Sequence, residues 1–144
     1  MTIPVPQVGA VIRFSYLWRE EADLGRSEGV KERPTAIIAA FSVDQSDKKR
    51  VVILPITTRP PREADVAVEI PAATRRAIGL GQDPCWVICN HSNRFIWPGS
   101  DIRPVSAIPK RWILGMLPPG LFSKIINAFV RSGRAGKYRP VDRD

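Results

Sequence analysis

The chain has 144 residues, of which 44% are hydrophobic, a size and composition that suit one domain with a single core. Its 22 lysine and arginine residues exceed its 14 acidic residues, and the net charge of +8 predicts a polyanionic partner such as nucleic acid, although an evenly basic solvated surface would carry the same charge. There is no apolar run of about 18 residues and no secretory signal pattern, so we expect a soluble, cytoplasmic protein with no membrane partner.

The first half of the chain predicts strands separated by one long charged loop. The strands are expected from alternating or β-branched residues at 8–18, 34–43 and 50–58, with a turn at 44–49. Residues 19–33 have many charges and almost no apolar side chain, which predicts a mobile, functional loop. Pro55 predicts an end or a bulge in the third strand, which must be over by Pro60.

The second half predicts two more strands and two helices. Strands are expected at 64–70 and 85–91, a short helix at 71–80 and an amphipathic helix at 118–133, with an irregular segment at 92–105. Residues 1–133 would form the one domain, and 134–144 a polar, frayed tail. The expected fold is mainly β: a small barrel with a short middle helix and a C-terminal helix.

The two cysteines, Cys85 and Cys89, fall within one predicted strand. A separation of four residues on a strand is too long for a disulfide. No second Cys or His pair completes a metal site, so we expect two buried free thiols, no metal and no cofactor.

The polar residues of interest lie at predicted strand ends, which converge in a small barrel. They are Arg33 before the second strand, Thr57 and Thr58 at the end of the third, and Asn90 and His91 at the end of the fifth. An arginine beside a threonine hydroxyl suits a phosphodiester, because the guanidinium grips two oxygens and the hydroxyl orients the group without adding charge. RNA cleavage of this kind needs no metal, since the 2′-OH of the substrate is the nucleophile.

Two plainer interpretations remain open. Arg33 can be a loop cation paired with Glu32 or Glu28, and Thr57 can be present for its β propensity alone.

The ordered set of motifs resembles the PemK/MazF family of toxin endoribonucleases. Its members have a glycine before an opening strand, then a charged loop ending in Arg-Pro, then a buried strand ending in Pro-Ile-Thr-Ser or a near variant. Gly9, Arg33-Pro34 and "PITT" at 55–58 occupy these places in order. The later "RRAIGL" and "ILGMLPPGLFSKIINAFV" are similar to the middle helix and C-terminal helix of the family, so the resemblance spans nearly the whole chain.

This resemblance implies an SH3-like barrel of the CcdB/PemK/MazF type, covering 1–133, that forms a homodimer and holds single-stranded RNA at or beside the dimer interface. The catalytic arginine and threonine of the family carry over to Arg33 and Thr57, and the mobile loop to 19–32. It also implies a cognate acidic antitoxin that occupies the RNA site. The candidate RNA-binding residues around the catalytic pair are Lys31, Thr58, Arg59, Asn90 and Trp18.

The sequence departs from some relatives at one point. They carry an Arg-x-Asp acid and base pair where this chain has Ile88 and Asn90. His91 has a suitable pKa to act as the base, but it can equally be a surface residue. Since neighbouring strand residues face opposite sides, only one of Asn90 and His91 should face the groove unless the strand bulges.

Four tryptophans add candidate stacking surfaces for unpaired bases. We expect Trp86 to be buried in its strand, and Trp18 and Trp97 to be partly exposed.

Two other functions are compatible with a basic barrel of this kind. One is a protein-binding toxin similar to the gyrase poison CcdB, which acts through its last residues. The other is a catalytically inactive barrel that binds nucleic acid or a peptide, an alternative that the neutral Asn90 supports.

Overall fold

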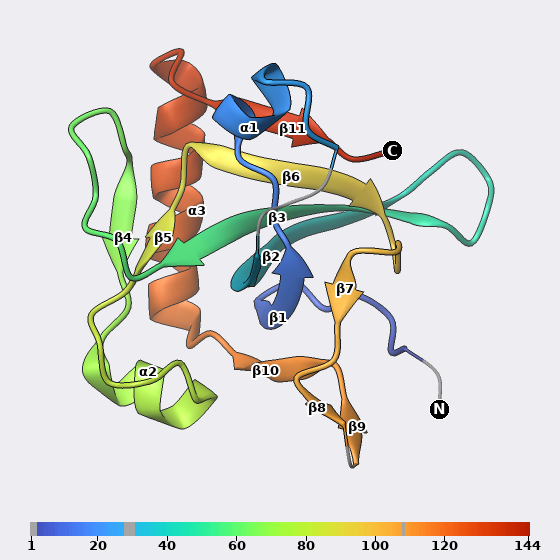
Figure 1. Cartoon of the computed structure of the whole chain (residues 1–144), viewed down its shortest axis with the longest axis horizontal. Coiled ribbons are helices and arrows are strands. Elements are labelled where there is room, and N and C mark those ends of the chain that lie inside the picture. The colour runs from blue at the N-terminus through green and yellow to red at the C-terminus, as the bar shows by residue number, and fades with distance from the viewer. Residues whose placement is uncertain (1–2, 28–30, 108) are drawn as a thin grey trace.

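The computed structural model describes residues 3–27, 31–107 and 109–144, which fold into a mainly antiparallel sheet with three helices (Figure 1). The mainly β class is therefore confirmed. The elements, in chain order, are β1 (Ala10–Ser15), α1 (Arg19–Asp23), β2 (Glu32–Ser42), β3 (Lys49–Thr57), β4 (Ala67–Glu69), α2 (Ala72–Ile78), β5 (Trp86–Ile88), β6 (His91–Ile96), β7 (Ile102–Arg103), β8 (Ser106–Ala107), β9 (Lys110–Arg111), β10 (Ile113–Met116), α3 (Pro119–Arg134) and β11 (Arg139–Asp142).

Six strands of the main sheet lie side by side in the order β10-β1-β2-β3-β5-β4. The long strand β3 has two partners on one edge, because its first half pairs with β6 and its last two residues pair with β5. β7 pairs with β1, and β11 pairs with β6 in the only parallel ladder of the described residues. Within those residues the pairings form no closed ring, so the small barrel stays a prediction.

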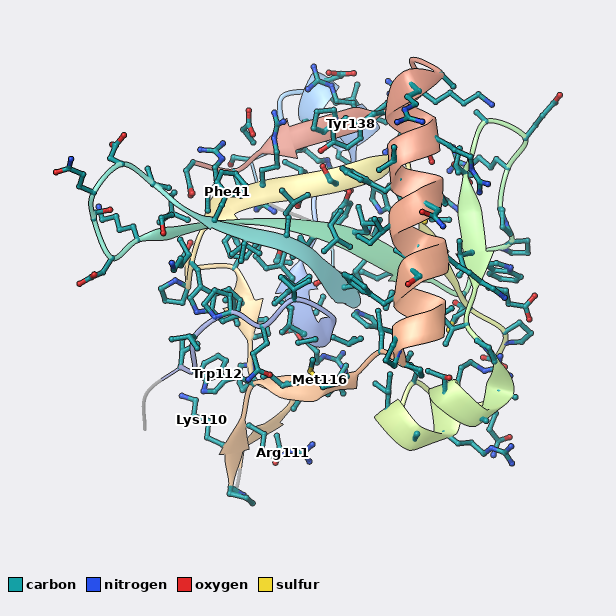
Figure 2. All side chains as sticks on the ribbon, turned by 180° about the vertical axis from the view of Figure 1, so that it is seen from behind. Phe41, Lys110, Arg111, Trp112, Met116 and Tyr138 are labelled. Carbon is teal, nitrogen blue, oxygen red and sulfur yellow. The ribbon has the colours of Figure 1, made fainter. Side chains whose placement is uncertain are left out.

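The sheet buries one apolar core on each face. Alternate residues of β1 and β3 divide between them, with Val11 and Leu54 in one core and Ile12 and Ile53 in the other. The first core is covered by α3, which crosses that face of the sheet in both views (Figures 1 and 2). The second core contains the stacked rings of Phe14 and Phe95, whose centres are 4.6 Å apart. It also includes Tyr16 and Trp18.

The two helices expected from the sequence are present. α2 begins after Pro71 and ends at Gly79, whose φ of +84° is a left-handed conformation that glycine adopts without steric cost. α3 turns Leu121, Ile125 and Ala128 toward the sheet, which is the spacing of an amphipathic helix. None of the helices in the described ranges is long and apolar enough to cross a membrane.

The expectation of a loop through residues 19–33 is wrong at both ends. Residues 19–23 form α1, and Arg33 already lies inside β2; residues 28–30 of the expected loop are outside the described ranges. Local polar contacts hold the short helix: Trp18 N donates to Glu21 Oε1 at 3.0 Å, and Arg19 pairs with Asp23 at 3.1 Å. Apolar patterning could not indicate a helix that is held in this way.

The strand expected at 85–91 is divided by a turn. β5 ends at Ile88, and β6 begins at His91 and runs through a segment that was expected to be irregular. His91, Ser92 and Asn93 of β6 are buried, and Asn93 bonds to the backbone of a distant segment: it accepts from Leu17 N at 2.9 Å and donates to Leu17 O at 2.7 Å. A polar sequence can therefore form an internal strand here.

The expectation of a frayed tail over 134–144 is also wrong, because its residues 139–142 form β11 against β6. Asp142 accepts from Arg94 at 2.6 Å and from Arg50 at 3.1 Å. The side chain of Arg143 is only 3% exposed, pairs with Asp101 at 3.1 Å and donates to Ser15 O at 2.7 Å. These partners are distant in sequence and could not be identified from the tail alone.

Candidate functional site at the ends of β2 and β3

Arg33 and Thr57 lie near the adjoining ends of the neighbouring strands β2 and β3. Thr35 pairs with Pro55 at the end of the β2–β3 ladder, and Arg33 and Thr57 each lie two residues beyond that pair, on the same face as Thr35 and Pro55. β3 runs two residues past Pro55 and ends at Thr57, before Pro60 as expected. Residues that oppose each other in an antiparallel pair project from the same face of the sheet, so the cation and the hydroxyl are on one side.

Both residues line a pocket of about 260 Å³ at this end of the strands. Lys31 and Thr58, two of the expected RNA-binding residues, are exposed and line it as well. Its other walls include the apolar side chains of Ile56, Leu80 and Leu114. The pocket thus combines three cationic side chains, one carboxylate and two hydroxyl groups with apolar walls.

Trp18 is the residue around which the charged groups gather. The guanidinium carbon of Arg33 lies 5.2 Å from the ring centre, that of Arg59 lies 5.3 Å from it, and the His91 ring meets it edge-on at 5.3 Å. Trp18 is only 9% exposed, so the expectation that it would be partly exposed is wrong. It serves as a surface against which two guanidinium groups are held.

The surroundings of Arg33 favour an anion beside it. Burial lowers the pKa of this guanidinium, the positive charge of Arg59 lowers it further, and Glu21 and Tyr16 act in the opposite direction. Its Nε is buried and has no hydrogen-bond partner among the described residues. A half-buried cation that lacks a partner and has a second cation close by gains from a bound oxyanion.

Glu32 does not pair with Arg33. Its carboxylate lies 3.5 Å from Arg13 and 3.7 Å from Arg103 instead. Glu28, the other proposed partner, lies outside the described residues. The plainer interpretation of Arg33 as a loop cation paired with Glu32 is therefore not what the structure has.

Thr57 is buried, with 8% of its surface exposed, and its hydroxyl is partly engaged. Thr57 Oγ1 accepts from Arg59 N at 3.1 Å. A threonine hydroxyl also has one hydrogen to donate, which this contact does not use. The bond fixes the oxygen at the end of β3 and leaves its hydrogen for another acceptor.

His91 shares the face of the sheet that carries Arg33 and Thr57. Asn93 pairs with Ile53 at the end of the β3–β6 ladder, and His91 lies two residues beyond Asn93 in β6, on the same face of that strand. The ring is 5% exposed, and its Nδ1 is buried with no partner among the described residues. Burial lowers the pKa of His91, and the remaining charges around it act in both directions.

Asn90 has a structural place. Its Oδ1 accepts from Val66 N at 2.9 Å, and its Nδ2 donates to Ala64 O at 3.2 Å and to Lys137 O at 3.4 Å. Asn90 and His91 both line a second pocket, of about 440 Å³, which does not include Arg33 or Thr57. Both residues face one pocket because the chain turns at 89–90 before β6 begins, so the expected alternation between them does not apply.

Arg13 is a residue of the first pocket that sequence reasoning left out. It lines the pocket and pairs with Glu32, its neighbour across β1 and β2. The sequence contains one indication of Arg13, its polar position in the alternating pattern of the first strand. That pattern shows only that Arg13 faces away from Ile12 and Phe14, and it does not connect the residue with a pocket.

Of the three other tryptophans, Trp86 lies beside the candidate site, because it pairs with Thr57 across β5 and β3. Trp86 is half-buried, contrary to the expectation of full burial, and Trp97 is half-buried as expected. Trp97 donates through its indole nitrogen to Pro4 O at 2.8 Å.

The thiols of Cys85 and Cys89 are free and buried, as predicted. Burial raises the pKa of Cys89 to about 12, so this thiol is unreactive at neutral pH. In the parts of the chain that the structure describes, no group of three or more His, Cys, Asp or Glu residues is placed to hold a metal ion.

The sequence matches no model of a known protein family, and no curated protein shows significant similarity to it. Function must therefore be inferred from the residues of the chain itself.

Proposed function

We propose that this chain is a metal-independent endoribonuclease toxin of the PemK/MazF kind, which cuts single-stranded RNA in the cytoplasm and is silenced by an acidic antitoxin. The proposal includes an SH3-like arrangement of the sheet and a homodimer. The observation that carries it is the placement of Arg33 and Thr57 at the adjoining ends of neighbouring strands, where both line one pocket. The excess of basic residues agrees with a polyanionic substrate and with an acidic inhibitor that competes for the same surface.

The reaction that Arg33 and Thr57 would catalyse is transesterification of a phosphodiester. The 2′-oxygen of the RNA attacks phosphorus, the bond to the 5′-oxygen breaks, and the products are a 2′,3′-cyclic phosphate and a free 5′-hydroxyl. Arg33 grips the non-bridging oxygens and stabilises the negative charge that grows on them. The Thr57 hydroxyl donates to one of those oxygens and orients the group, since its hydrogen is not used in the contact with Arg59.

His91 is the proposed base that accepts the proton of the 2′-OH. It lies on the face that carries the catalytic pair, and its ring contacts the tryptophan that holds Arg33. Because its pKa is lowered, the imidazole is in the neutral form that a base requires at physiological pH. Asn90, by contrast, is occupied with three backbone partners and is assigned no role in the reaction.

The two alternative functions receive less support from the geometry. A toxin that binds protein through its last residues needs an accessible C-terminus, whereas Val141 is buried and Asp142 is paired with two arginines. A purely binding barrel needs no buried hydroxyl at the pocket that holds its cation, and Thr57 supplies one here.

The test is cleavage of a labelled single-stranded RNA in EDTA by wild type, Arg33→Ala and Arg33→Lys. We expect wild type to cut and the alanine variant to lose roughly a hundredfold or more in rate, as when one group that stabilises transition-state charge is removed. The lysine variant should recover little, because it keeps the charge but not the fork of the guanidinium. Arg111→Ala is the matched control: Figure 2 shows this arginine on the β8–β9 hairpin, away from α3. Equal cutting by wild type and Arg33→Ala would refute the assignment.

A further inference from the structure

The second pocket is assembled from four segments that are far apart in the chain. It measures about 440 Å³ and lies between α1, the connection from β3 to β4, the turn before β6 and the connection from α3 to β11. No step of the proposed reaction uses its outer rim, which carries Arg62, Lys137 and Arg139 opposite Glu20 and Asp65. The rim therefore has a small excess of positive charge.

The walls of this pocket are held in place by one buried amide. Asn90, 2% exposed, bonds to the backbone of Val66, Ala64 and Lys137, and Arg139 N donates to Asn90 O at 2.7 Å. A buried side chain that satisfies backbone groups on both sides of a cavity fixes its shape before any ligand arrives.

Two of the rim cations are available to a ligand. Arg62 and Lys137 are exposed, and within the described ranges neither side chain has an ion-pair partner at 4.0 Å or less. Arg139 has only a long contact of 3.9 Å with Asp23. The carboxylate of Asp65 accepts from Arg62 N at 2.8 Å and has lone pairs left for a base amino group.

The two pockets are neighbours. Thr58 lines the first pocket and Arg62 lines the second. Arg62 is four residues after Thr58, so the two positions are at most about 14 Å apart even in a fully extended chain. Between them lie Arg59 and the Trp18 ring, which contacts Arg33 on the side of the first pocket and His91 in the second. A flexible polyanion that leaves the first pocket along this segment meets two cations, Arg59 and Arg62.

We propose that the second pocket binds a nucleotide of single-stranded RNA adjacent to the one held at Arg33, with its phosphate on Arg62 and Lys137 and its base facing Asp65. This assignment rests on the proposed function and names a subsite for its substrate. The mixed charge of the rim favours a nucleotide over a bare anion, because the carboxylates repel phosphate but accept hydrogen bonds from an exocyclic amino group.

The test is binding of a fully 2′-O-methylated single-stranded hexanucleotide, which cannot be cut, as a function of salt. We expect the double variant Arg62→Ala/Lys137→Ala to bind roughly tenfold more weakly than wild type. The slope of log affinity against log salt should become shallower by about 1.4, because two phosphate contacts of a single strand are lost. Arg62→Glu/Lys137→Glu should bind more weakly still. The control, Lys48→Ala/Arg111→Ala, removes the same charge from exposed positions on the β2–β3 turn and the β8–β9 hairpin.

The same proteins are then assayed for cleavage of the unmodified hexanucleotide, which separates this inference from the proposed function. If wild type cuts while the pocket variant binds as the control does, the second subsite is refuted and the ribonuclease assignment stands. If wild type does not cut but binding depends on Arg62 and Lys137, the subsite stands and the ribonuclease assignment is refuted. If wild type neither binds nor cuts, both are refuted.

Discussion

The guanidinium carbon of Arg33 lies 5.2 Å from the centre of the Trp18 ring. The sequence suggested these two residues as separate contacts for RNA, the arginine for phosphate and the tryptophan for a base. In the fold the tryptophan is covered and supports the arginine, so its contribution to RNA binding is indirect. This relationship explains how a cation with no bonded partner at its Nε can keep one orientation at the end of β2.

Replacing Trp18 should therefore affect the reaction through Arg33. We expect Trp18→Phe to keep most of the RNA cleavage rate, because a phenyl ring still offers a face to the guanidinium, and Trp18→Leu to lose about 0.5–2 kcal/mol of transition-state stabilisation. Rates are compared at saturating RNA, with thermal unfolding measured in parallel. A leucine variant that cuts as fast as the phenylalanine variant would contradict the supporting role.

His91 should make stability depend on pH in a defined direction. Its pKa is lowered in the folded protein by burial, so below its ordinary value of about 6.5 the unfolded chain binds a proton that the folded chain does not. The stabilisation is fully present above about pH 6.5 and is lost as pH falls through the folded pKa. Urea unfolding between pH 5 and 8 should show this loss in wild type and a smaller one in His91→Asn.

The same titration should appear in the rate if His91 is the base. Cleavage by wild type is expected to fall at acidic pH with a midpoint below 6.5, and His91→Asn should lack this limb as well as being slower. A variant that is only less stable would still show the fall of the cleavage rate at acidic pH. The pH profile therefore distinguishes loss of the base from loss of stability.

Asn90→Asp tests whether a carboxylate, as some PemK/MazF toxins have in the corresponding strand, fits this chain. The amide nitrogen of Asn90 donates to Ala64 O and Lys137 O, and a carboxylate cannot replace those bonds. We expect the substitution to lower the free energy of unfolding by about 1–3 kcal/mol and not to increase cleavage. Urea denaturation gives the first value, with Asn127→Asp on the exposed side of α3 as the control. An aspartate variant as stable as wild type would show that the amide bonds are not needed.

Arg143 should be essential to the fold even though it is the penultimate residue. Its buried guanidinium pairs with Asp101 and donates to Ser15 O and Asn93 Oδ1. Removing one partner of a buried ion pair costs about 3–5 kcal/mol, so Arg143→Ala should show a large drop in melting temperature. Arg134→Ala, at an exposed position, should not. Equal melting temperatures would mean that β11 is as loosely attached as the sequence suggested.

Apolar periodicity located the elements that are stabilised by apolar burial. The spacing of Leu121, Ile125 and Ala128 predicted α3, and Pro71 with Gly79 marked the ends of α2. The elements that were missed are held by polar contacts instead. α1 depends on the bond from Trp18 N to Glu21, and β11 on ion pairs with β6. Periodicity carries no information about such partners.

The site could be anticipated only in part, for a similar reason. Arg33 and Thr57 were expected to lie close together because each falls at the end of a predicted strand, and both line the first pocket. The burial of Trp18 and the occupation of the Asn90 amide arise from groups brought together by several distant segments. Composition suggested a nucleic-acid partner, but it could not separate the first pocket from the second.

The most direct test of the central claim is a double-mutant cycle of RNA cleavage with wild type, Arg33→Ala, Thr57→Val and the double variant, measured under single-turnover conditions. If both side chains act on one phosphodiester, the losses should not add, and the double variant should be about as slow as Arg33→Ala alone. Losses that multiply in full, or no loss in either single variant, would show that the two residues do not share a substrate.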